Sequence, residues 1–216
     1  MTLHDRSLED VNLSGAWLTI GSFDGVHRGH QAIIRRLVHD AHTAGDPAVV
    51  LTFHPHPAMV LRNRQEPFYL STPEERAELL GALGIDRVVT EPFNLQIAGL
   101  TAREFMGRVH RSLQPRHILV GYDFALGRGR EGNVERLKEL GQEFNYTLDV
   151  LQPIQQDGEI VSSSQVRAAL AEGEVRKAMR LLGRPYQVSG ATIHGDGRGR
   201  KLGIPTVNLD IWPWKA

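Results

Sequence analysis

Two histidines three positions apart lie in a glycine-rich run near the start of the chain. The run GSFDGVHRGH places His27 and His30 among Gly21, Gly25 and Gly29. Glycines let a backbone approach a ligand closely, and imidazole N–H groups can donate to phosphate oxygens. A helix beginning here would add free N–H groups, and an adjacent anion would favour the charged form of both rings. The run predicts a phosphate site, with a tight turn bearing surface histidines as the alternative.

A second run, VSSSQVR at residues 161–167, combines hydroxyl groups with a cation. Ser162, Ser163 and Ser164 can cap a helix and bind an anion at its N-terminus. Arg167 lies one turn beyond Ser163 on the same face, and a guanidinium suits the geometry of phosphate oxygens. A hydroxyl-rich helix start is often a cap and nothing more. The arginine at this spacing favours a triphosphate contact.

Residues 53–57, with the sequence FHPHP, form a stiff segment. Pro55 and Pro57 restrict the backbone on either side of His56. The segment either holds that ring at the edge of a sheet for a ligand or is a rigid loop exit with an exposed histidine. The spacing alone does not choose between the two.

Residues 127–132, GRGREG, satisfy the glycine pattern of dinucleotide-binding folds, and Asp149 lies where such a fold places its ribose-binding acid. The run follows a late apolar segment instead of the first. It also contains arginines where a dinucleotide fold needs close apolar packing. We interpret it as a basic loop near phosphates and keep the dinucleotide site as the rival hypothesis.

Short apolar runs of strand length alternate with segments of helical period through residue 151. The expected strands are residues 16–20, 49–53, 87–90, 117–121 and 147–151. The expected helices are residues 29–44, 72–81, 101–111 and 133–143, two of them with strong capping signals at Thr72 and Thr101. This alternation predicts an α/β fold with a Rossmann-like, doubly wound, mostly parallel sheet. Ligands then bind beyond the C-terminal ends of the strands, where the runs above begin.

The alternation of apolar runs and helical segments ends after residue 151. Two short helices are expected over residues 163–171 and 174–182, and the tripeptide GRP at 183–185 is typical of a boundary. A glycine-rich stretch and a strand over residues 205–211 follow. We therefore expect one domain over residues 1–183 and part of a second over residues 184–216.

Composition excludes several classes of protein. The 216 residues hold 25 Lys and Arg against 25 Asp and Glu, a balance that argues against a nucleic-acid or membrane-surface partner. The chain has no cysteine, which excludes disulfides, thiolate metal sites and thiol nucleophiles. The N-terminus lacks the apolar region of a signal peptide, and no apolar run is long enough to cross a bilayer. We expect a cytoplasmic protein.

One further run completes a family pattern. Residues 121–127, GYDFALG, follow the fourth expected strand. Together with residues 21–30, 53–57 and 161–167, they resemble, in order, the motifs of the HxGH adenylyltransferase superfamily, and specifically those of bacterial bifunctional riboflavin kinase/FAD synthetases. The resemblance extends over residues 16–210.

This resemblance implies an FMN adenylyltransferase that passes AMP from ATP, bound with Mg²⁺, to FMN and yields FAD and pyrophosphate. It implies catalytic roles for His27, His30 and Arg167. The implied ATP-binding residues are Gly21, Phe23, Asp24, Gly25, His27, Gly29, His30, Ser162, Ser163, Ser164 and Arg167. The implied FMN-binding residues are Phe53, Pro55, His56, Pro57, Asp123, Phe124 and Leu126. Asp24 is either structural or orients its loop, and no metal ligands are assigned in this domain.

Two departures from the family pattern limit these expectations. Leu126 stands where a second aromatic residue is usual, so it keeps apolar contact with a flavin and loses stacking. Residues 184–216 resemble the opening of a riboflavin kinase module, in which Thr206 and Asn208 are the implied nucleotide and Mg²⁺ ligands. A β-barrel needs more strands than the roughly two that these residues supply. We therefore expect a truncated kinase module without kinase activity in this chain.

Two other functions remain open. An adenylyltransferase of the same superfamily acting on another phosphorylated acceptor would keep the histidine pair. A non-catalytic flavin- or nucleotide-binding protein would bind ATP and FMN without releasing pyrophosphate.

Overall fold

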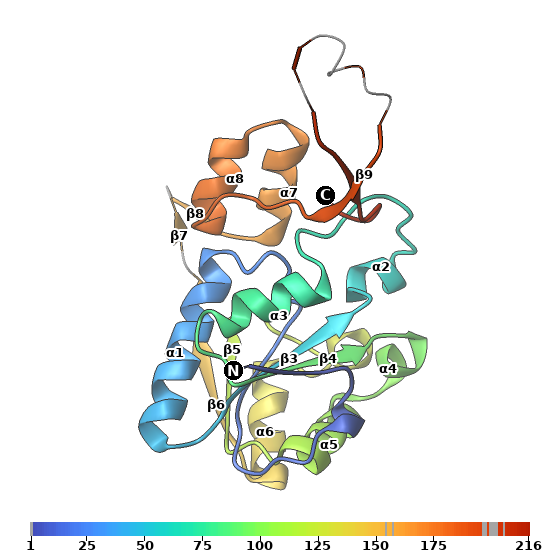
Figure 1. The fold of residues 1–216 in the computed structure, drawn as a ribbon. Coiled ribbons are helices and arrows are strands. Elements are labelled where there is room, and N and C mark those ends of the chain that lie inside the picture. The colour runs from blue at the N-terminus through green and yellow to red at the C-terminus, as the bar shows by residue number, and fades with distance from the viewer. Residues whose placement is uncertain (1, 154, 157, 196–197, 199–202, 205) are drawn as a thin grey trace.

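A six-stranded parallel sheet forms the centre of the computed structural model, which describes residues 2–153, 155–156, 158–195, 198, 203–204 and 206–216 (Figure 1). The strands are β1 (Leu3–Asp5), β2 (Trp17–Ile20), β3 (Ala48–His54), β4 (Arg87–Pro92), β5 (His117–Gly121) and β6 (Thr147–Leu151). Their order across the sheet is β1-β4-β3-β2-β5-β6. Because β2 pairs with both β3 and β5, the chain winds outward in two directions from the centre, as the alternating pattern predicted.

Helices cover both faces of this sheet. The longer ones are α1 (Arg28–Ala44), α3 (Pro73–Gly81), α5 (Ala102–Leu113) and α6 (Val134–Phe144). Along β3, Val49 and Leu51 pack into a core with α5 and α6, whereas Ala48 and Val50 pack into a second core with α1 and α3. A strand buried on both faces needs apolar residues at every position, which explains its unbroken apolar run.

The helix starts follow the capping signals of the sequence. Thr72 and Thr101 each accept a hydrogen bond from the backbone of a glutamate three residues on, and that glutamate bonds back to the threonine N–H. Each pair satisfies two helix donors that otherwise lack partners. These boxes fix the N-termini of α3 and α5 at the expected positions.

Several short elements were not predicted. They are α2 (Pro57–Leu61), α4 (Leu95–Gly99), the single helical turns η1 (Leu8–Asp10) and η2 (Arg128–Arg130), the edge strand β1, and the hairpin of β7 (Gln155–Gln156) and β8 (Glu159–Ile160). Each has five residues or fewer, which is too short for apolar periodicity to identify it.

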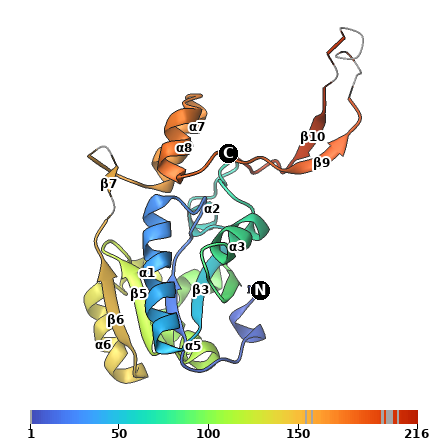
Figure 2. The same cartoon turned by 60° about the vertical axis from the view of Figure 1, so that its left-hand side comes forward.

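Beyond the sheet, α7 (Ser163–Ala171) and α8 (Val175–Leu182) pack together around a third apolar core. The strands β9 (Gly190–Ile193) and β10 (Asn208–Ile211) then form an exposed antiparallel pair that projects from the body of the molecule (Figure 2). The expected strand over 205–211 therefore begins later, at Asn208. Pro205 lies outside the described residues, and Thr206 precedes the strand.

The last residues of the chain return to the main body. The backbone N–H groups of Phe68 and Tyr69 donate to the carbonyl of Trp214 at 2.9 and 2.8 Å, and the Tyr69 and Trp212 rings lie 4.9 Å apart. Lys215 pairs with Glu75 on α3. Residues 212–216, which we call the tail, thus contact the segment that leads into α3.

Candidate functional site

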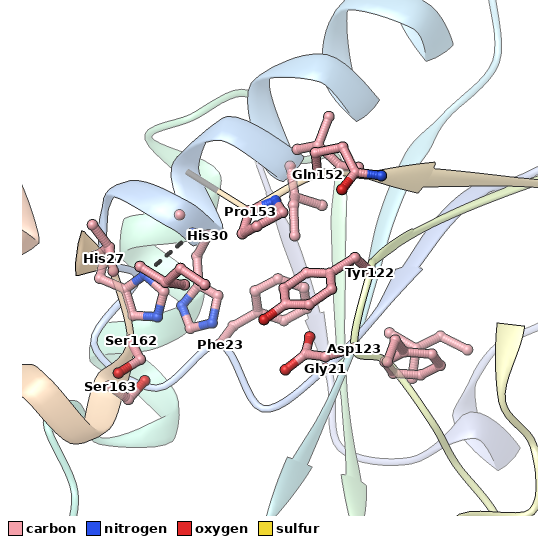
Figure 3. A pocket seen from close by; sticks show the side chains of 18 residues that line it. Gly21, Phe23, His27, His30, Tyr122, Asp123, Gln152, Pro153, Ser162 and Ser163 are labelled. Carbon is pink, nitrogen blue, oxygen red and sulfur yellow. Dashed lines mark hydrogen bonds between the residues drawn. The ribbon is translucent and has the colours of Figure 1, made fainter. Parts of the chain in front are cut away.

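A cavity of about 320 Å³ opens beyond the C-terminal ends of β2, β5 and β6 (Figure 3). The chain changes direction across the sheet between β2 and β5, and ligands of doubly wound folds bind at this crevice. The cavity is lined by Ile20, Gly21, Phe23, His27, Gly29, His30, Ile33, Gly121, Tyr122, Asp123, Phe124, Leu151, Gln152, Pro153, Ile160, Val161, Ser162 and Ser163.

The loop between β2 and α1 has a sharply turned backbone. Phe23 and Val26 have φ of 46° and 41°, and Gly25 has φ of 75°. A side chain at Gly25 would meet Leu70 at 2.8 Å, so this glycine allows both the turn and the close contact. Left-handed backbone in the two apolar residues is uncommon and is typical of functional loops. The turn brings Phe23 and His27 to the cavity.

His27 is the N-cap of α1. Its Nδ1 accepts a hydrogen bond from the backbone N–H of His30 at 3.3 Å, shown as a dashed line in Figure 3. In the neutral ring this bond assigns the hydrogen to Nε2, which is then the nitrogen that can donate to a ligand. The rings of His27 and His30 stack with centroids 3.6 Å apart, and the edge of Phe23 contacts His30. The pair is therefore held in one orientation by backbone and ring contacts.

Both rings of this pair are neutral near pH 7. Burial lowers the pKa of His27 to about 4, with Asp24 acting in the opposite direction. Loss of water also lowers the pKa of His30 well below its ordinary value, and the neighbouring His27 adds to the effect. In the free protein desolvation thus outweighs the nearby carboxylate, and the charged form would require an adjacent anion. In this state the rings offer hydrogen bonds and no charge.

Asp24, which is buried in this loop, forms an ion pair with the partly buried Arg167 of α7. The Arg167 Nη2 donates to Asp24 at 2.6 Å, its Nε donates to the Phe68 carbonyl at 2.7 Å, and its guanidinium lies 3.7 Å from the Phe68 ring centroid. Asp24 has no exposed surface and also accepts from the N–H groups of Leu70 and Ser71. Both residues hold the loop in place, and neither lines the cavity.

The N-terminus of α7 faces the cavity from the side opposite β5. Ser162 caps the helix by accepting from the N–H of Gln165 at 3.3 Å, and the Ser163 hydroxyl donates to the carbonyl of Asp24 at 3.0 Å. Of the three predicted serines, Ser162 and Ser163 line the cavity, whereas Ser164 is exposed and does not. Two helix N-termini, those of α1 and α7, therefore meet at one cavity, and both favour an anion.

The predicted flavin-binding residues divide into two groups. Asp123 and Phe124 line the cavity together with Tyr122, just beyond β5. Leu126 does not line it, since its side chain packs against the core and its backbone pairs with Gly132 at 3.1 and 2.9 Å.

The FHPHP segment lies away from the lining of this cavity. Phe53 is buried in the core, and Pro55 follows a cis peptide bond. His56 is the N-cap of α2: its Nδ1 accepts from the N–H of Ala58 at 3.0 Å, and burial lowers its pKa to about 4. Pro57 is the first residue of α2. The local role of His56 is therefore to begin a short helix.

The dinucleotide hypothesis for residues 127–132 is not supported by the packing. A side chain at Gly127 would meet the backbone N of Ala102 at 2.7 Å, and one at Gly132 would meet the Ala102 side chain at 2.6 Å. These glycines allow close packing against the start of α5. Asp149 lies in a separate cavity of about 110 Å³ with Trp17 and Arg36.

Four functional candidates were not predicted from the sequence. Tyr122 lines the cavity just beyond β5, in the GYDFALG run but without an assigned role. Gln152 and Pro153 line the cavity just after β6, so the rule that sites form at strand ends indicates them. Arg76 is fully buried on the inner face of α3, and its position one turn before the buried Leu80 is the sequence signal that indicates it. Among the described residues, no group of three or more His, Asp or Glu side chains could hold a metal ion.

Comparison with known proteins identifies two regions of similarity. Residues 9–165 match the family model of FAD synthetase, and residues 182–215 match that of riboflavin kinase. The chain is 40% identical over 198 residues to a bifunctional riboflavin kinase/FMN adenylyltransferase of Pseudomonas fluorescens, covering 91% of this chain and 63% of the relative. It is 35% identical over 207 residues to the protein of the same description from Escherichia coli K12, covering 95% and 66%. The chain thus spans less than two thirds of these relatives.

A solved structure is also similar. A protein from Streptococcus pneumoniae described as a macrolide-efflux protein superposes with a TM-score of 0.87 and 29% identity, covering all of this chain and 70% of the other. In the part of the chain that the structure describes, no helix is both long and apolar enough to span a membrane.

Proposed function

Because the chain belongs to the FAD synthetase family, we propose that it transfers AMP from ATP to FMN and releases FAD and pyrophosphate. One observation supports this most directly: the stacked His27–His30 pair lies between two helix N-termini at a cavity of about 320 Å³. Stacked neutral donors and helix dipoles suit a phosphate chain that must be aligned without a protein nucleophile.

In the proposed reaction the substrates supply the reacting groups. A phosphate oxygen of FMN attacks the α-phosphorus of ATP, a P–O bond forms, and the bond to the β-phosphate oxygen breaks to release pyrophosphate. The protein aligns the two anions and stabilises the charge that develops. His27 donates from Nε2, His30 donates from its ring, and backbone N–H groups at the starts of α1 and α7 complete the set. Tyr122 and Phe124 offer aromatic surface to the flavin.

We propose that Mg²⁺ arrives with ATP as part of the substrate. Asp123 is the one carboxylate among the described cavity-lining residues. Mg²⁺ is commonly held by one or two carboxylates together with substrate phosphates, so this arrangement fits the ion better than an all-protein cage would. Asp123 is therefore the proposed protein contact for the metal.

The role of Arg167 is proposed to be support of the loop instead of direct contact with the triphosphate. Its guanidinium is already engaged by Asp24 and the Phe68 carbonyl. The FMN-binding roles of Phe53, His56 and Leu126 stay predictions from the sequence.

We further propose that the first domain covers residues 1–183 and that residues 184–216 do not phosphorylate riboflavin by themselves. Their described part contributes the two strands β9 and β10, whereas a barrel requires several. Thr206 and Asn208 remain predicted nucleotide and Mg²⁺ ligands of that second module.

The deciding experiment incubates the chain with FMN, ATP and Mg²⁺ and separates the flavins by chromatography. We expect FAD and an equal amount of pyrophosphate. Riboflavin in place of FMN is the control and should stay unchanged. FMN and ATP that bind without pyrophosphate release would instead establish a non-catalytic binding protein, and turnover of a different phosphorylated acceptor would identify another adenylyltransferase.

A further inference from the structure

Arg76 is a fully buried cation behind the proposed nucleotide site. It lies on the inner face of α3 with 0% of its surface exposed. Its Nη1 donates to the Thr52 hydroxyl at 2.9 Å and to the Phe53 carbonyl at 3.2 Å, at the C-terminal end of β3. Among the described residues, its Nε and Nη2 have no hydrogen-bond partner, and no carboxylate lies within ion-pair distance. Burying an arginine in this state is costly, so its presence calls for a function.

The guanidinium is connected to the loop that lines the cavity. The Thr52 hydroxyl, which accepts from Arg76, donates to the carbonyl of Ser22 at 2.9 Å. Ser22 lies between Gly21 and Phe23, both of which line the cavity. One residue and two hydrogen bonds therefore separate the buried charge from the loop after β2.

The charge of Arg76 also reaches the histidines. Loss of water lowers the pKa of His30, and the groups that face this ring from other elements lower it further: His27 on the α1 cap, Arg76 on α3, Arg167 on α7 and His56 before α2. Because the largest of these influences all favour the uncharged form, the surroundings hold the His30 ring neutral.

Direct cations are missing from the cavity itself. The described lining residues include no lysine or arginine, and the two histidines are neutral near pH 7. Arg167 is paired with Asp24, so the group of Asp24, Arg76 and Arg167 has one carboxylate for two guanidiniums, and Glu74 on α3 acts on Arg76 from outside this group. The excess positive charge of this group resides on Arg76.

We propose that Arg76 is the fixed positive charge of the nucleotide site, a positioning residue that attracts the triphosphate across His30 and the Ser22 backbone without touching it. A preorganised charge of this kind needs no rearrangement when phosphates arrive, and low-dielectric surroundings strengthen its field. An arginine suits the role because it stays protonated when buried. The inference rests on the proposed adenylyl transfer for its meaning in catalysis.

The test compares two variants: Arg76→Gln removes the positive charge, and Arg76→Lys keeps it. Inorganic pyrophosphate, titrated calorimetrically with and without Mg²⁺, is the probe, and the KM for ATP is measured in parallel. We expect Arg76→Gln to weaken pyrophosphate binding and to raise the KM for ATP about 10-fold or more, and Arg76→Lys to stay within about 3-fold of the parent. Arg103→Gln, which removes an exposed arginine of α5 paired with Glu143 of α6, is the matched control and should change neither value.

A second readout separates charge from structure. In an NMR titration of the histidines, Arg76→Gln should raise the pKa of His30, whereas a merely structural role of Arg76 would not move it in that direction. Pyrophosphate affinity that is unchanged in Arg76→Gln, or equally reduced in Arg76→Gln and Arg76→Lys, would overturn the proposal.

Thr52→Val covers the case in which Arg76→Gln fails to fold, because it breaks the bonds to Arg76 and Ser22 while keeping the charge. Retained pyrophosphate binding in Arg76→Lys and Thr52→Val then supports the proposal, and loss in both refutes it. The outcome is separable from the proposed function. The chain could make no FAD and still bind pyrophosphate with an affinity that depends on the charge at residue 76. That result would refute the proposed adenylyl transfer and support the proposed role of Arg76.

Discussion

At His27, one side chain both begins a helix and faces the cavity. Its Nδ1 accepts the His30 N–H, so only Nε2 remains for a ligand. Asparagine at this position can cap the helix, because it is a good N-cap residue, but it has no imidazole to donate to a ligand. This division makes the two tasks experimentally separable.

We predict that His27→Asn and His27→Ala both lose FAD formation by about 10²-fold, the usual cost of one well-placed donor. Only His27→Ala should also lose stability, by about 1 kcal/mol, because the cap is gone. Urea unfolding and the rate of FAD formation measure the two effects. Equal stability of the variants would show that the cap contributes nothing.

The neutral histidines predict a pH-dependent stability. The pKa values of His27 and His56 lie at about 4 in the folded chain, below the ordinary 6.5. The unfolded chain therefore binds more protons between these values, and stability falls as the pH falls through this window. Each histidine should cost about 2 kcal/mol between pH 7 and pH 5.

This dependence is measured by urea unfolding at pH 7 and pH 5. His56→Asn, which preserves the α2 cap, should remove the contribution of His56 and reduce the loss of stability between pH 7 and pH 5. His39→Asn on the exposed face of α1 is the control and should leave the profile as steep as before. A parent protein equally stable at both pH values would contradict the neutral state of the rings.

At the scale of elements, the loop after β2 depends on a close contact with the segment before α3. Gly25 approaches Leu70 too closely for any side chain, and its N–H donates to the Ser71 hydroxyl at 3.0 Å. Gly45 at the end of α1 has the same φ of 75°, but a side-chain carbon added there would meet nothing within 4 Å. The two glycines thus differ in packing and not in backbone conformation.

Gly45→Ala should cost about 1 kcal/mol of stability, the penalty of left-handed backbone alone. Gly25→Ala should cost about 1 to 3 kcal/mol more, because Leu70 must move, and it should reduce FAD formation as the loop shifts. Thermal unfolding and the FAD assay provide the comparison. Similar losses in the two variants would mean that the loop tolerates the contact.

The elements that the sequence predicted are those with a local physical signature. The strands near Val49 and Ile118 were recognisable because both of their faces are covered, and the starts of α3 and α5 because Thr72 and Thr101 are cap residues. The elements β1, α2 and α4 escaped because three to five residues cannot display a period.

The site was predictable to the same extent. His27, His30, Ser162 and Ser163 meet at the cavity because each follows a strand or begins a helix. The pairing of Arg167 with Asp24 joins residues 143 positions apart, and no local pattern encodes it. Cytoplasmic location stays a prediction from composition.

At the scale of the whole molecule, the tail links the second region to the site. Trp214 accepts from Phe68 and Tyr69, and the Tyr69 hydroxyl in turn accepts from the N–H of His56 at 2.8 Å. Leu70 and Ser71, the next residues along, hold Asp24. The tail therefore supports the segment on which the loop after β2 depends.

Removal of residues 212–216 should lower the thermal midpoint and slow FAD formation, because the segment at 68–71 loses three backbone hydrogen bonds and the Trp212 contact. Val207→Ser is the control within the same region, since Val207 is 73% exposed and its change should leave both measurements unaltered. Full activity and an unshifted midpoint after removal of the tail would show that the contact is incidental.

The cavity without lysine or arginine among its described lining residues also has a consequence for turnover. In the proposed reaction, neutral imidazole donors give pyrophosphate single hydrogen bonds at His27 and His30, without the opposite charge and the paired donors that a guanidinium clamp would add, so the product is held less tightly. The charge of Arg76, which does not touch the ligand, attracts an incoming nucleotide over a distance. It binds the departing pyrophosphate less tightly than a cation in direct contact would. In the proposed reaction, the arrangement that attracts the nucleotide would also favour departure of pyrophosphate.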